Sequence, residues 1–339
     1  MNDTNPSERA VHGMAKAFAR VGVLPFMMLA ALIIFSLLSE NFLTASNLLN
    51  ALRQNSYIVI VVLAQFIVLL SGGFDLSVGS TTALVSVTSA TAMAGQTATG
   101  ASPTVAIIIG IATGLVTGLA CGLTNGIGVA VLKVNPFIMT LATASVFQGI
   151  ALRMTQGVPV YGMPREFPDN FGFRVIGGLG VSVWIALGAA GLLWALLTYT
   201  RPGRHIFAIG SNPEAAELSG VRNVRTLILT YATAGVLVAL GSVLLTARLT
   251  TGEANIGSSL PLESIAAAVI GGVSLRGGIG KVYNAVFGAL FIGLVINGMN
   301  LARIESNYQM IVIGVVLAAA VIADRFRERV ASAVLAGKV

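Results

Sequence analysis

The chain alternates long runs of apolar residues with short polar connections. About 20 apolar residues are enough for a helix to cross the hydrocarbon core of a bilayer, and fewer suffice where a broken helix is shielded by protein. Ten runs fit this description and are expected to be spans: 21–39, 56–71, 77–95, 104–121, 136–153, 181–199, 226–247, 262–273, 282–301 and 308–323.

This pattern predicts an all-α fold, a polytopic membrane helix bundle of about ten transmembrane helices, some of them broken or half helices. The eighth run is short, and residues 123–133 either extend the fourth helix or form a half-helix of their own. The domain organisation that follows is an N-terminal tail (1–20), a transmembrane domain (21–324) containing a polar loop (201–225), and a C-terminal tail (325–339).

Composition agrees with a membrane protein. Hydrophobic residues make up 55% of the chain and charged residues 10%, against about 25% charged in soluble domains. The first run follows basic residues, as a signal peptide does, but it is longer than a typical signal core and ends at Ser39–Asn41 without a small-x-small cleavage pattern. We therefore expect a retained helix.

The basic residues predict an orientation. With the N-terminus inside and the sides alternating, most of the 20 Lys and Arg residues fall inside, as the positive-inside rule requires. Both termini are then expected to be cytoplasmic. Because the basic residues are spread over many loops, nucleic-acid binding is not indicated. The internal set is Arg9, Lys16, Arg20, Lys133, Arg201, Arg204, Arg222, Arg225, Arg276, Lys281, Arg325, Arg327, Arg329 and Lys338.

The polar loop 201–225 contains a short helix signal. Asn is a favoured N-cap, Pro a favoured first helical residue, Glu suits the first turn, and Gly closes the far end. A helix of about two turns is unstable alone in water, so we expect it to rest against a partner protein outside the bilayer. Its residues are Asn212, Pro213, Glu214, Ala215, Ala216, Glu217, Leu218, Ser219 and Gly220.

One acid, Asp75, falls well within an otherwise apolar region. A carboxylate there costs about 2.5 to 3.5 kcal/mol on insertion scales, so it should face protein or water. The surrounding sequence, 72–79, permits a sharp break, after which Asp75 or Ser77 caps a restarted helix. The segment either lines a cavity or is a simple N-cap at a tight turn. Residues 271–278 repeat its glycine pattern, which is weak evidence for a duplication.

Polar side chains in the spans are few, and the main ones are the amides Gln65, Asn125, Gln148, Asn297, Asn300 and Gln309. Amides suit transient hydrogen bonds to hydroxyl-rich solutes, but they also join helices, at about 0.6 to 2 kcal/mol each. Helix joining is the commoner role, and we expect at most two or three of the six to face a path. The candidate path residues are Asp75, Ser77, Gly79, Asn125, Asn297 and Asn300.

The sequence lacks the residues that a phosphate-binding loop, a metal site or a catalytic triad requires. The nearest approach to a phosphate loop, at Gly280-Lys281, has Leu275 in place of the first glycine and Val282 in place of the hydroxyl. His12, His205 and Cys121 cannot assemble a metal site or a catalytic triad. We expect no catalytic residue, no metal and no cofactor in this chain, with energy supplied by another subunit.

Four motifs resemble one family: GGFDLSVGS (72–80), GSNPEAAELSGV (210–221), IAAAVIGGVSLRGGIG (265–280), and NGMNL with YQMIVIGVVLAAAVIAD (297–324). They are similar to the ribose-type permease family of bacterial ABC importers, over about residues 40–325. Phe74 and Val273 stand where Ile and Thr are common in that family, both conservative changes.

The resemblance implies an inner-membrane permease, normally a homodimer in the lipid bilayer. Its partners would be a cytoplasmic ATPase, which binds the ATP, and a periplasmic solute-binding protein. The 212–220 helix would be the coupling helix that docks in a cleft on the ATPase. Family members carry monosaccharides, inositol or related polyols, and some carry furanone-like signals or nucleosides. Since polar residues in the spans are few, selectivity is expected to reside mostly in the binding protein.

Three rival functions remain at this stage. The first is a secondary transporter of a small polar solute in which Asp75 couples proton flow. The second, an intramembrane enzyme, would need paired catalytic groups at one depth, and the sequence offers no such pair. The third is a structural membrane scaffold.

Overall fold

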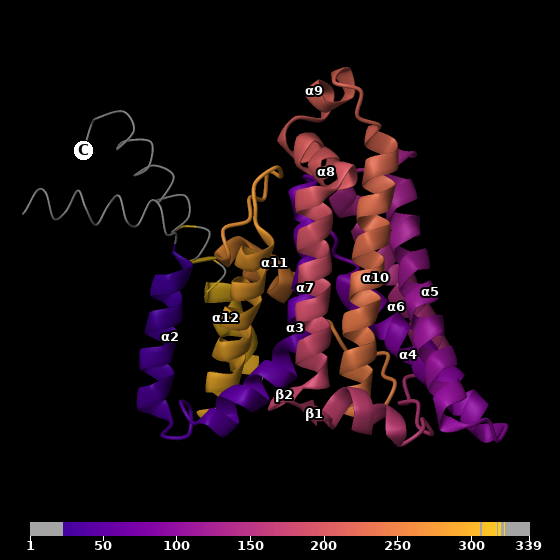
Figure 1. Cartoon of the computed structure of the whole chain (residues 1–339), viewed down its shortest axis with the longest axis vertical. Coiled ribbons are helices and arrows are strands. Elements are labelled where there is room, and N and C mark those ends of the chain that lie inside the picture. Colours follow the sequence, from indigo (N-terminus) through magenta and orange to yellow (C-terminus); the bar gives the residue numbers. More distant parts are fainter. Residues whose placement is uncertain (1–22, 306, 317, 320–321, 323–339) are drawn as a thin grey trace, which may run out of the picture.

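The computed structural model describes residues 23–305, 307–316, 318–319 and 322. The expected tails 1–20 and 325–339 lie outside the described residues, as do parts of the first and last expected spans. The regular secondary structure of the described residues is helical apart from one small hairpin and one isolated bridge (Figure 1). Its elements are α2 (Leu24–Leu38), α3 (Ala45–Leu70), α4 (Val78–Ala98), α5 (Pro103–Ala130), α6 (Pro136–Thr155), η1 (Pro168–Phe173), β1 (Val175–Ile176), β2 (Leu179–Gly180), α7 (Val181–Tyr199), α8 (Arg201–Ser211), α9 (Pro213–Leu218), α10 (Asn223–Leu249), α11 (Leu260–Ile270) and α12 (Val282–Leu301).

The helices confirm a polytopic membrane bundle. Within the described residues, six are long and apolar enough to cross a bilayer: α3, α5, α6, α7, α10 and α12. Three shorter apolar helices, α2, α11 and residues 307–316, also coincide with expected spans. The expected span 77–95 is α4, which has 21 residues. Residues 123–130 extend α5, which settles the alternative left open there.

Local sequence explains where several helices begin. Ser102 and Asn135 each precede a proline at the first helical position and accept a hydrogen bond from a backbone N–H of the first turn. Thr44 caps α3 in the same way through the N–H of Asn47, at 3.3 Å. These starts are set by short-range hydrogen bonds, so they can be read from the chain itself.

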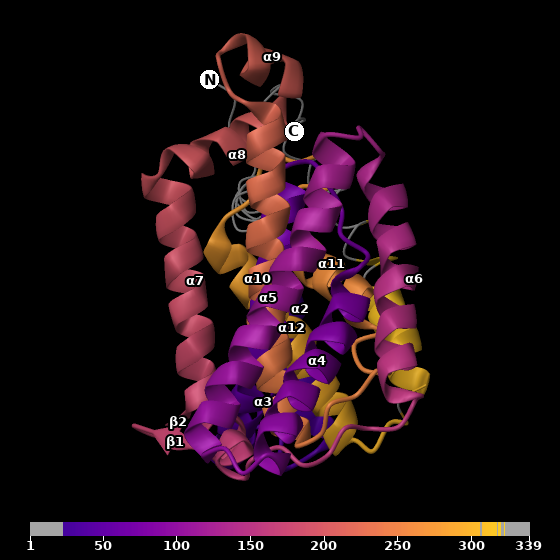
Figure 2. The same cartoon turned by 90° about the vertical axis from the view of Figure 1, so that its right-hand side faces the viewer.

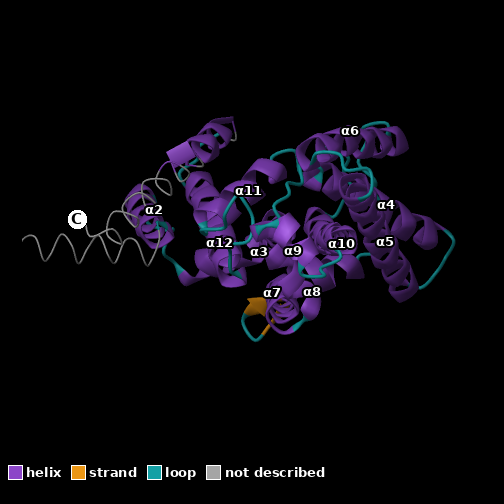
Figure 3. Cartoon of the chain, turned by 90° about the horizontal axis from the view of Figure 1, so that it is seen from above, coloured by secondary structure: helices purple, strands orange, loops and turns teal. Residues whose placement is uncertain are grey.

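The centre of the bundle is formed by α3 and α10, with α4, α5 and α6 on one side and α12, α11 and α2 on the other (Figures 1 and 3). Residues 58–70 of α3 are all buried. α5 packs closely on α10 because glycines meet at the crossing. A methyl group at Gly118 or Gly122 would strike the backbone of α10, and one at Gly235 would strike α5.

The two ends of the bundle differ. α8 lies at one end of the bundle and α9 projects beyond it, and the hairpin β1–β2 and η1 lie at the opposite end (Figures 1 and 2). We call these the α8 end and the hairpin end. α2 starts at the α8 end (Figure 1). α4 starts partway along the bundle and runs to the hairpin end, so the chain enters the bundle as a loop before the helix begins (Figure 2).

Candidate functional site

The expected short helix is present as α9, and its capping is the one predicted. The Asn212 side-chain oxygen accepts a hydrogen bond from the N–H of Ala215 at 3.0 Å, with Pro213 at the first helical position. At the far end Gly220 has φ +84°, and the N–H of Val221 donates to the carbonyl of Ala216. This is a Schellman ending, which satisfies carbonyls that a helix end leaves unpaired.

α9 stands largely free of its own chain. Ala216 is its one buried residue, whereas Glu214, Glu217 and Leu218 are exposed, and Leu218 is 91% exposed. The structure therefore presents two carboxylates and a large apolar side chain together on a six-residue helix outside the bundle.

The 201–225 loop holds a second helix that sequence reasoning missed. α8 begins after Thr200, whose hydroxyl accepts a hydrogen bond from the N–H of Gly203 at 3.3 Å, and it buries Ile206 and Ile209 against the bundle. The sequence does carry signals of this helix: a capping threonine, a proline after it, and apolar residues three positions apart. The polar island is thus one anchored amphipathic helix followed by one protruding helix.

The end of α8 touches both of the repeated glycine segments. We call residues 71–77 the first glycine loop and residues 271–281 the second. The N–H of Gly278 donates to the carbonyl of Leu70 at 2.9 Å. A methyl group at Gly210 would strike the Leu70 carbonyl and the Gly278 nitrogen, and one at Gly277 would lie 2.8 Å from the Cα of Gly72. Three backbones meet here at a distance that side chains would prevent.

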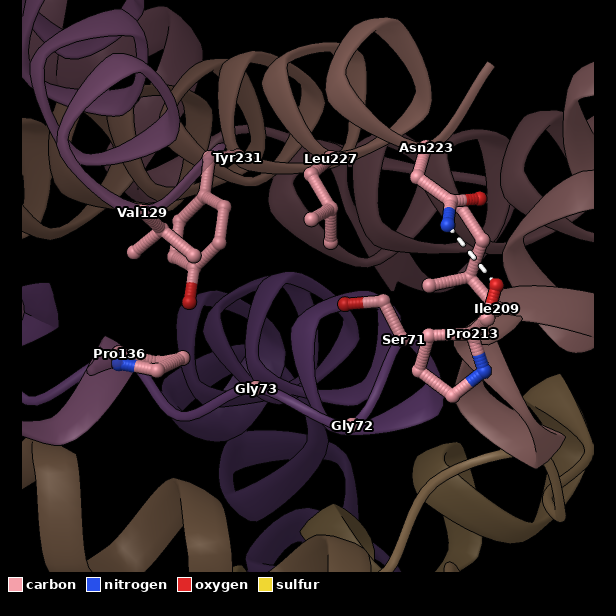
Figure 4. A pocket seen from close by; sticks show the side chains of 10 residues that line it. All are labelled: Ser71, Gly72, Gly73, Val129, Pro136, Ile209, Pro213, Asn223, Leu227 and Tyr231. Carbon is pink, nitrogen blue, oxygen red and sulfur yellow. Dashed lines mark hydrogen bonds between the residues drawn. The ribbon is translucent and has the colours of Figure 1, made fainter. Parts of the chain in front are cut away.

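A cavity of about 160 Å³ lies beside this meeting point, between α8, α9, α5, α10 and the first glycine loop (Figure 4). Its wall is mostly apolar, and Ser71 and Tyr231 supply hydroxyls. At its edge the Asn223 amide donates to the Pro213 carbonyl at 2.9 Å, which ties the start of α9 to the start of α10 (Figure 4). The lining residues are Ser71, Gly72, Gly73, Val129, Pro136, Ile209, Pro213, Asn223, Leu227 and Tyr231.

Three of the candidate path residues form one buried hydrogen-bond chain. The Asp75 carboxylate accepts from the backbone N–H of Ser77 at 2.8 Å and from its hydroxyl at 2.6 Å. The Asn125 amide donates to the Ser77 hydroxyl at 2.8 Å and accepts from the Thr143 hydroxyl at 2.6 Å. This chain joins the first glycine loop to α5 and α6, so Asp75 faces protein, as the insertion cost demands.

The expected capping of α4 by Asp75 or Ser77 is not observed. Asp75 accepts from the N–H of Ser77, which precedes the first helical residue, and the Ser77 side chain makes no capping bond to α4. Gly79 lies one turn further along, where a methyl group would strike the carbonyl of Gly257 in the segment before α11. Because Gly79 has no side chain, the backbone of α4 can pack closely against the backbone at Gly257.

The other two candidates lie elsewhere. Asn297 on α12 exchanges two hydrogen bonds with Asn47 on α3, at 2.9 and 3.0 Å. Asn300 accepts from Gln309 at 2.8 Å, which holds the 307–316 helix to α12. α12 lies across α3 from α4 and α5 (Figure 3). In this structure these amides join helices, whereas the buried Gln65 amide makes no hydrogen bond with the described residues.

Groups of three or more His, Cys, Asp or Glu side chains that could hold a metal ion do not occur among the described residues. The buried polar groups are arranged to join helices, and a protruding helix is anchored to two glycine loops. The class of protein that this fold and site define is a polytopic membrane protein with a short helix that protrudes from one end of the bundle.

Comparison with known proteins identifies that class more closely. A family model described as branched-chain amino acid transport system / permease component matches residues 47–321. The ribose import permease protein RbsC of Bacillus subtilis is 41% identical, covering 89% of this chain and 92% of the relative. The D-allose transport system permease protein AlsC of Escherichia coli is 35% identical, covering 94% and 95%. The L-arabinose transport system permease protein AraH of Escherichia coli is 41% identical, covering 77% of each chain. No solved structure matches.

The chain belongs to this permease family, within its ribose-type branch of sugar ABC permeases. Its relatives are transport permeases and not enzymes, and they favour an ATP-driven importer over the ion-coupled alternative. An import permease of this class works with partners such as an ATPase and a solute-binding protein.

Proposed function

We propose that the chain is the membrane-spanning subunit of an ATP-driven importer that carries a monosaccharide or related polyol across a bacterial inner membrane. In this proposal two copies form a homodimer in the lipid bilayer. A cytoplasmic ATPase binds the ATP, and a periplasmic binding protein delivers the solute. The relatives whose names specify ribose, allose and arabinose support this solute class.

The observation that carries the proposal is the continuous connection from α9 to the centre of the bundle. α9 offers an exposed surface, α8 anchors it, and the end of α8 contacts both glycine loops through backbone. The first glycine loop leads into the Asp75 hydrogen-bond chain and α4. Closely packed backbones transmit displacement because they cannot be compressed, so a push on α9 moves both loops.

The charge distribution supports a cytoplasmic location for α9. The α8 end carries Lys133, Arg201, Arg204, Arg222, Arg225, Arg276 and Lys281, and its exposed acids are Glu214 and Glu217. At the hairpin end, Arg53, Arg153, Arg165, Arg174, Arg248 and Arg303 stand with Glu40, Glu166, Asp169, Glu253 and Glu305. An excess of basic residues marks the cytoplasmic side. Because α2 starts at the α8 end, the proposal also makes the N-terminus cytoplasmic, and an even number of crossings would place the C-terminus there too.

The mechanism we propose is alternating access across the interface of the two copies. The binding protein delivers solute at the hairpin end, and closure of the ATPase pair pushes on α9 and moves the glycine loops. Tight binding of the solute within the membrane is not needed, since it would slow release.

The test reverses the charge of α9. Glu214→Lys with Glu217→Lys should weaken association with the ATPase and lower ATP-driven uptake into proteoliposomes, while membrane insertion is unchanged. The matched control, Glu40→Lys with Glu305→Lys, makes the same charge change at the hairpin end and should leave ATPase association intact. Normal uptake by the α9 variant would refute the docking role, and uptake driven by a proton gradient without ATP would refute the importer.

A further inference from the structure

The connection between α10 and α11 enters the bundle from the hairpin end as non-helical chain. Gly252 pairs with Val160 through two backbone hydrogen bonds, of 2.7 and 2.9 Å, outside the end of α6. The N–H of Glu253 then donates to the Ser86 hydroxyl, and Gly257 packs on Gly79. From 253 to 257 the segment therefore follows α4 from Ser86 to Gly79, a distance of about 10 Å along that helix.

A second contact fixes the depth of this segment. The Gln148 amide on α6 donates to the carbonyl of Ala254 at 2.6 Å. Gln148 lies seven residues inside Thr155, where α6 ends, which is about 10 Å at 1.5 Å per residue. Residues beyond 254 are deeper still, because the chain continues toward Gly79. The segment 255–259 therefore lies at the depth of the spans, and α11 starts there.

At this depth two polar side chains are exposed. Ala254 packs in a buried cluster with residues of α4, α5 and α6, whereas Asn255, the next residue in the turn, is exposed. Asn255 and Ser258 are both exposed, and neither side chain makes a hydrogen bond to another described residue. Leu262, 60% exposed on the first turn of α11, is near them in sequence.

Exposed amide and hydroxyl groups at this depth are unfavourable against lipid tails, because hydrocarbon offers no hydrogen-bond partner. Non-helical backbone within a membrane is tolerated where it lines a water-filled cavity or is covered by protein. The neighbouring acids are not among the exposed polar side chains of this segment, since Glu263 is 8% exposed and Glu253 is half-buried and accepts a hydrogen bond from the Thr251 hydroxyl. The exposed groups are neutral and able both to donate and to accept, which matches the hydroxyl groups of a sugar.

We propose that Asn255 and Ser258 contact the solute during its passage and discriminate among polyhydroxylated solutes by hydrogen bonding to their hydroxyl groups. Leu262 offers an apolar surface for the C–H face of the sugar ring. The inference rests on the proposed function and concerns residues outside the six candidate path residues named above. The proposal is wrong if this segment instead faces lipid or is covered by protein.

Cysteine labelling tests whether these residues face water. The chain has a single cysteine, Cys121, which is 4% exposed and can be replaced by alanine as a background. Asn255→Cys and Ser258→Cys should react with a charged, membrane-impermeant methanethiosulfonate in the assembled transporter during ATP turnover. The control is Val116→Cys, at the middle of α5 and 65% exposed, which should stay unlabelled. Unreactive cysteines at both 255 and 258 would overturn the proposal.

Transport selectivity tests solute contact directly. ATP-driven uptake of D-ribose and of 2-deoxy-D-ribose is measured with the same ATPase and binding protein, so their contribution cancels between variants. Asn255→Leu should lower the ribose-to-deoxyribose ratio about tenfold, since a site that hydrogen-bonds a hydroxyl discriminates against its absence. Ser258→Ala, a smaller change that is easier for the fold to accommodate, should lower it in the same direction.

The outcomes separate the two proposals. Suppose that the wild-type complex imports ribose, allose or arabinose with ATP, but that both variants keep the wild-type ratio of ribose to deoxyribose uptake. Solute contact is then refuted and the proposed function stands. If the wild-type complex imports none of these sugars with ATP, the proposed function fails and the solute contact falls with it.

Discussion

Replacing Gly210 with alanine perturbs the point where α8 meets both glycine loops. The added methyl group would strike the Leu70 carbonyl and the nitrogen of Gly278. These two atoms are themselves hydrogen-bonded at 2.9 Å, so the methyl group must separate them or displace α8. Both atoms belong to the backbone, so no rotamer change relieves the clash.

The magnitude follows from two effects. Overpacking in a close-packed region costs about 1 to 3 kcal/mol. Loss of the Gly278–Leu70 hydrogen bond removes about 0.5 to 1.5 kcal/mol more. The opposing gain, the better helix propensity of alanine, is about 1 kcal/mol at most, and it is reduced here because Gly210 is close to the end of α8. We therefore expect a net loss of roughly 1 to 4 kcal/mol.

The assay compares Gly210→Ala with Gly188→Ala. Gly188 is within α7, and a methyl group there would have no neighbour within 4 Å among the described residues. Gly210→Ala should lower the melting temperature of the purified protein and reduce the stimulation of ATP hydrolysis by solute-loaded binding protein. Gly188→Ala should change neither. Equal melting temperatures and equal stimulation for the two variants would refute the reasoning that backbone contact at Gly210 joins α8 to the loops.

Two further predictions concern buried amides. Gln65→Leu should raise the melting temperature, because the Gln65 amide is fully buried without a partner and each such unpaired group costs about 1 to 3 kcal/mol, whereas leucine is similar in volume; a lower melting temperature would contradict this. Asn297→Leu should destabilise the protein by about 0.6 to 2 kcal/mol through loss of its pair with Asn47. Here a double-mutant cycle with Asn47→Leu gives the check, and a coupling energy near zero would count against the pair.

Elements determined by neighbouring residues were predictable. The spans follow from runs of apolar residues, and all ten expected runs coincide with described helices, although six are long and apolar enough to count as spans among the described residues. α9 was predicted with its N-cap and its closing glycine, because capping bonds join residues three to five positions apart. α8 carried similar signals at Thr200 and was missed because its charged residues concealed a short apolar face.

The site depended on contacts that local sequence does not encode. The resemblance between 72–79 and 271–278 indicated a repeated pattern, but not that both segments would meet the end of α8. Of the six candidate path residues, Asp75, Ser77 and Asn125 are bonded together, whereas Asn297 and Asn300 lie on α12 with partners of their own. An amide has the same hydrogen-bonding groups wherever it lies, so only the packing decides which partner it finds.

The sequence alone determined that this chain crosses a membrane many times, where most of its helices lie, and that a capped helix stands in its largest basic loop. Hydrophobic runs and capping bonds involve residues that are close together in the chain, so they can be recognised from the sequence alone. Only the tertiary structure decided that α8 contacts two distant glycine loops and that Asn255 and Ser258 are exposed at the depth of the spans. Both features arise where segments far apart in the chain approach one another, and that approach is set by the packing of the whole bundle.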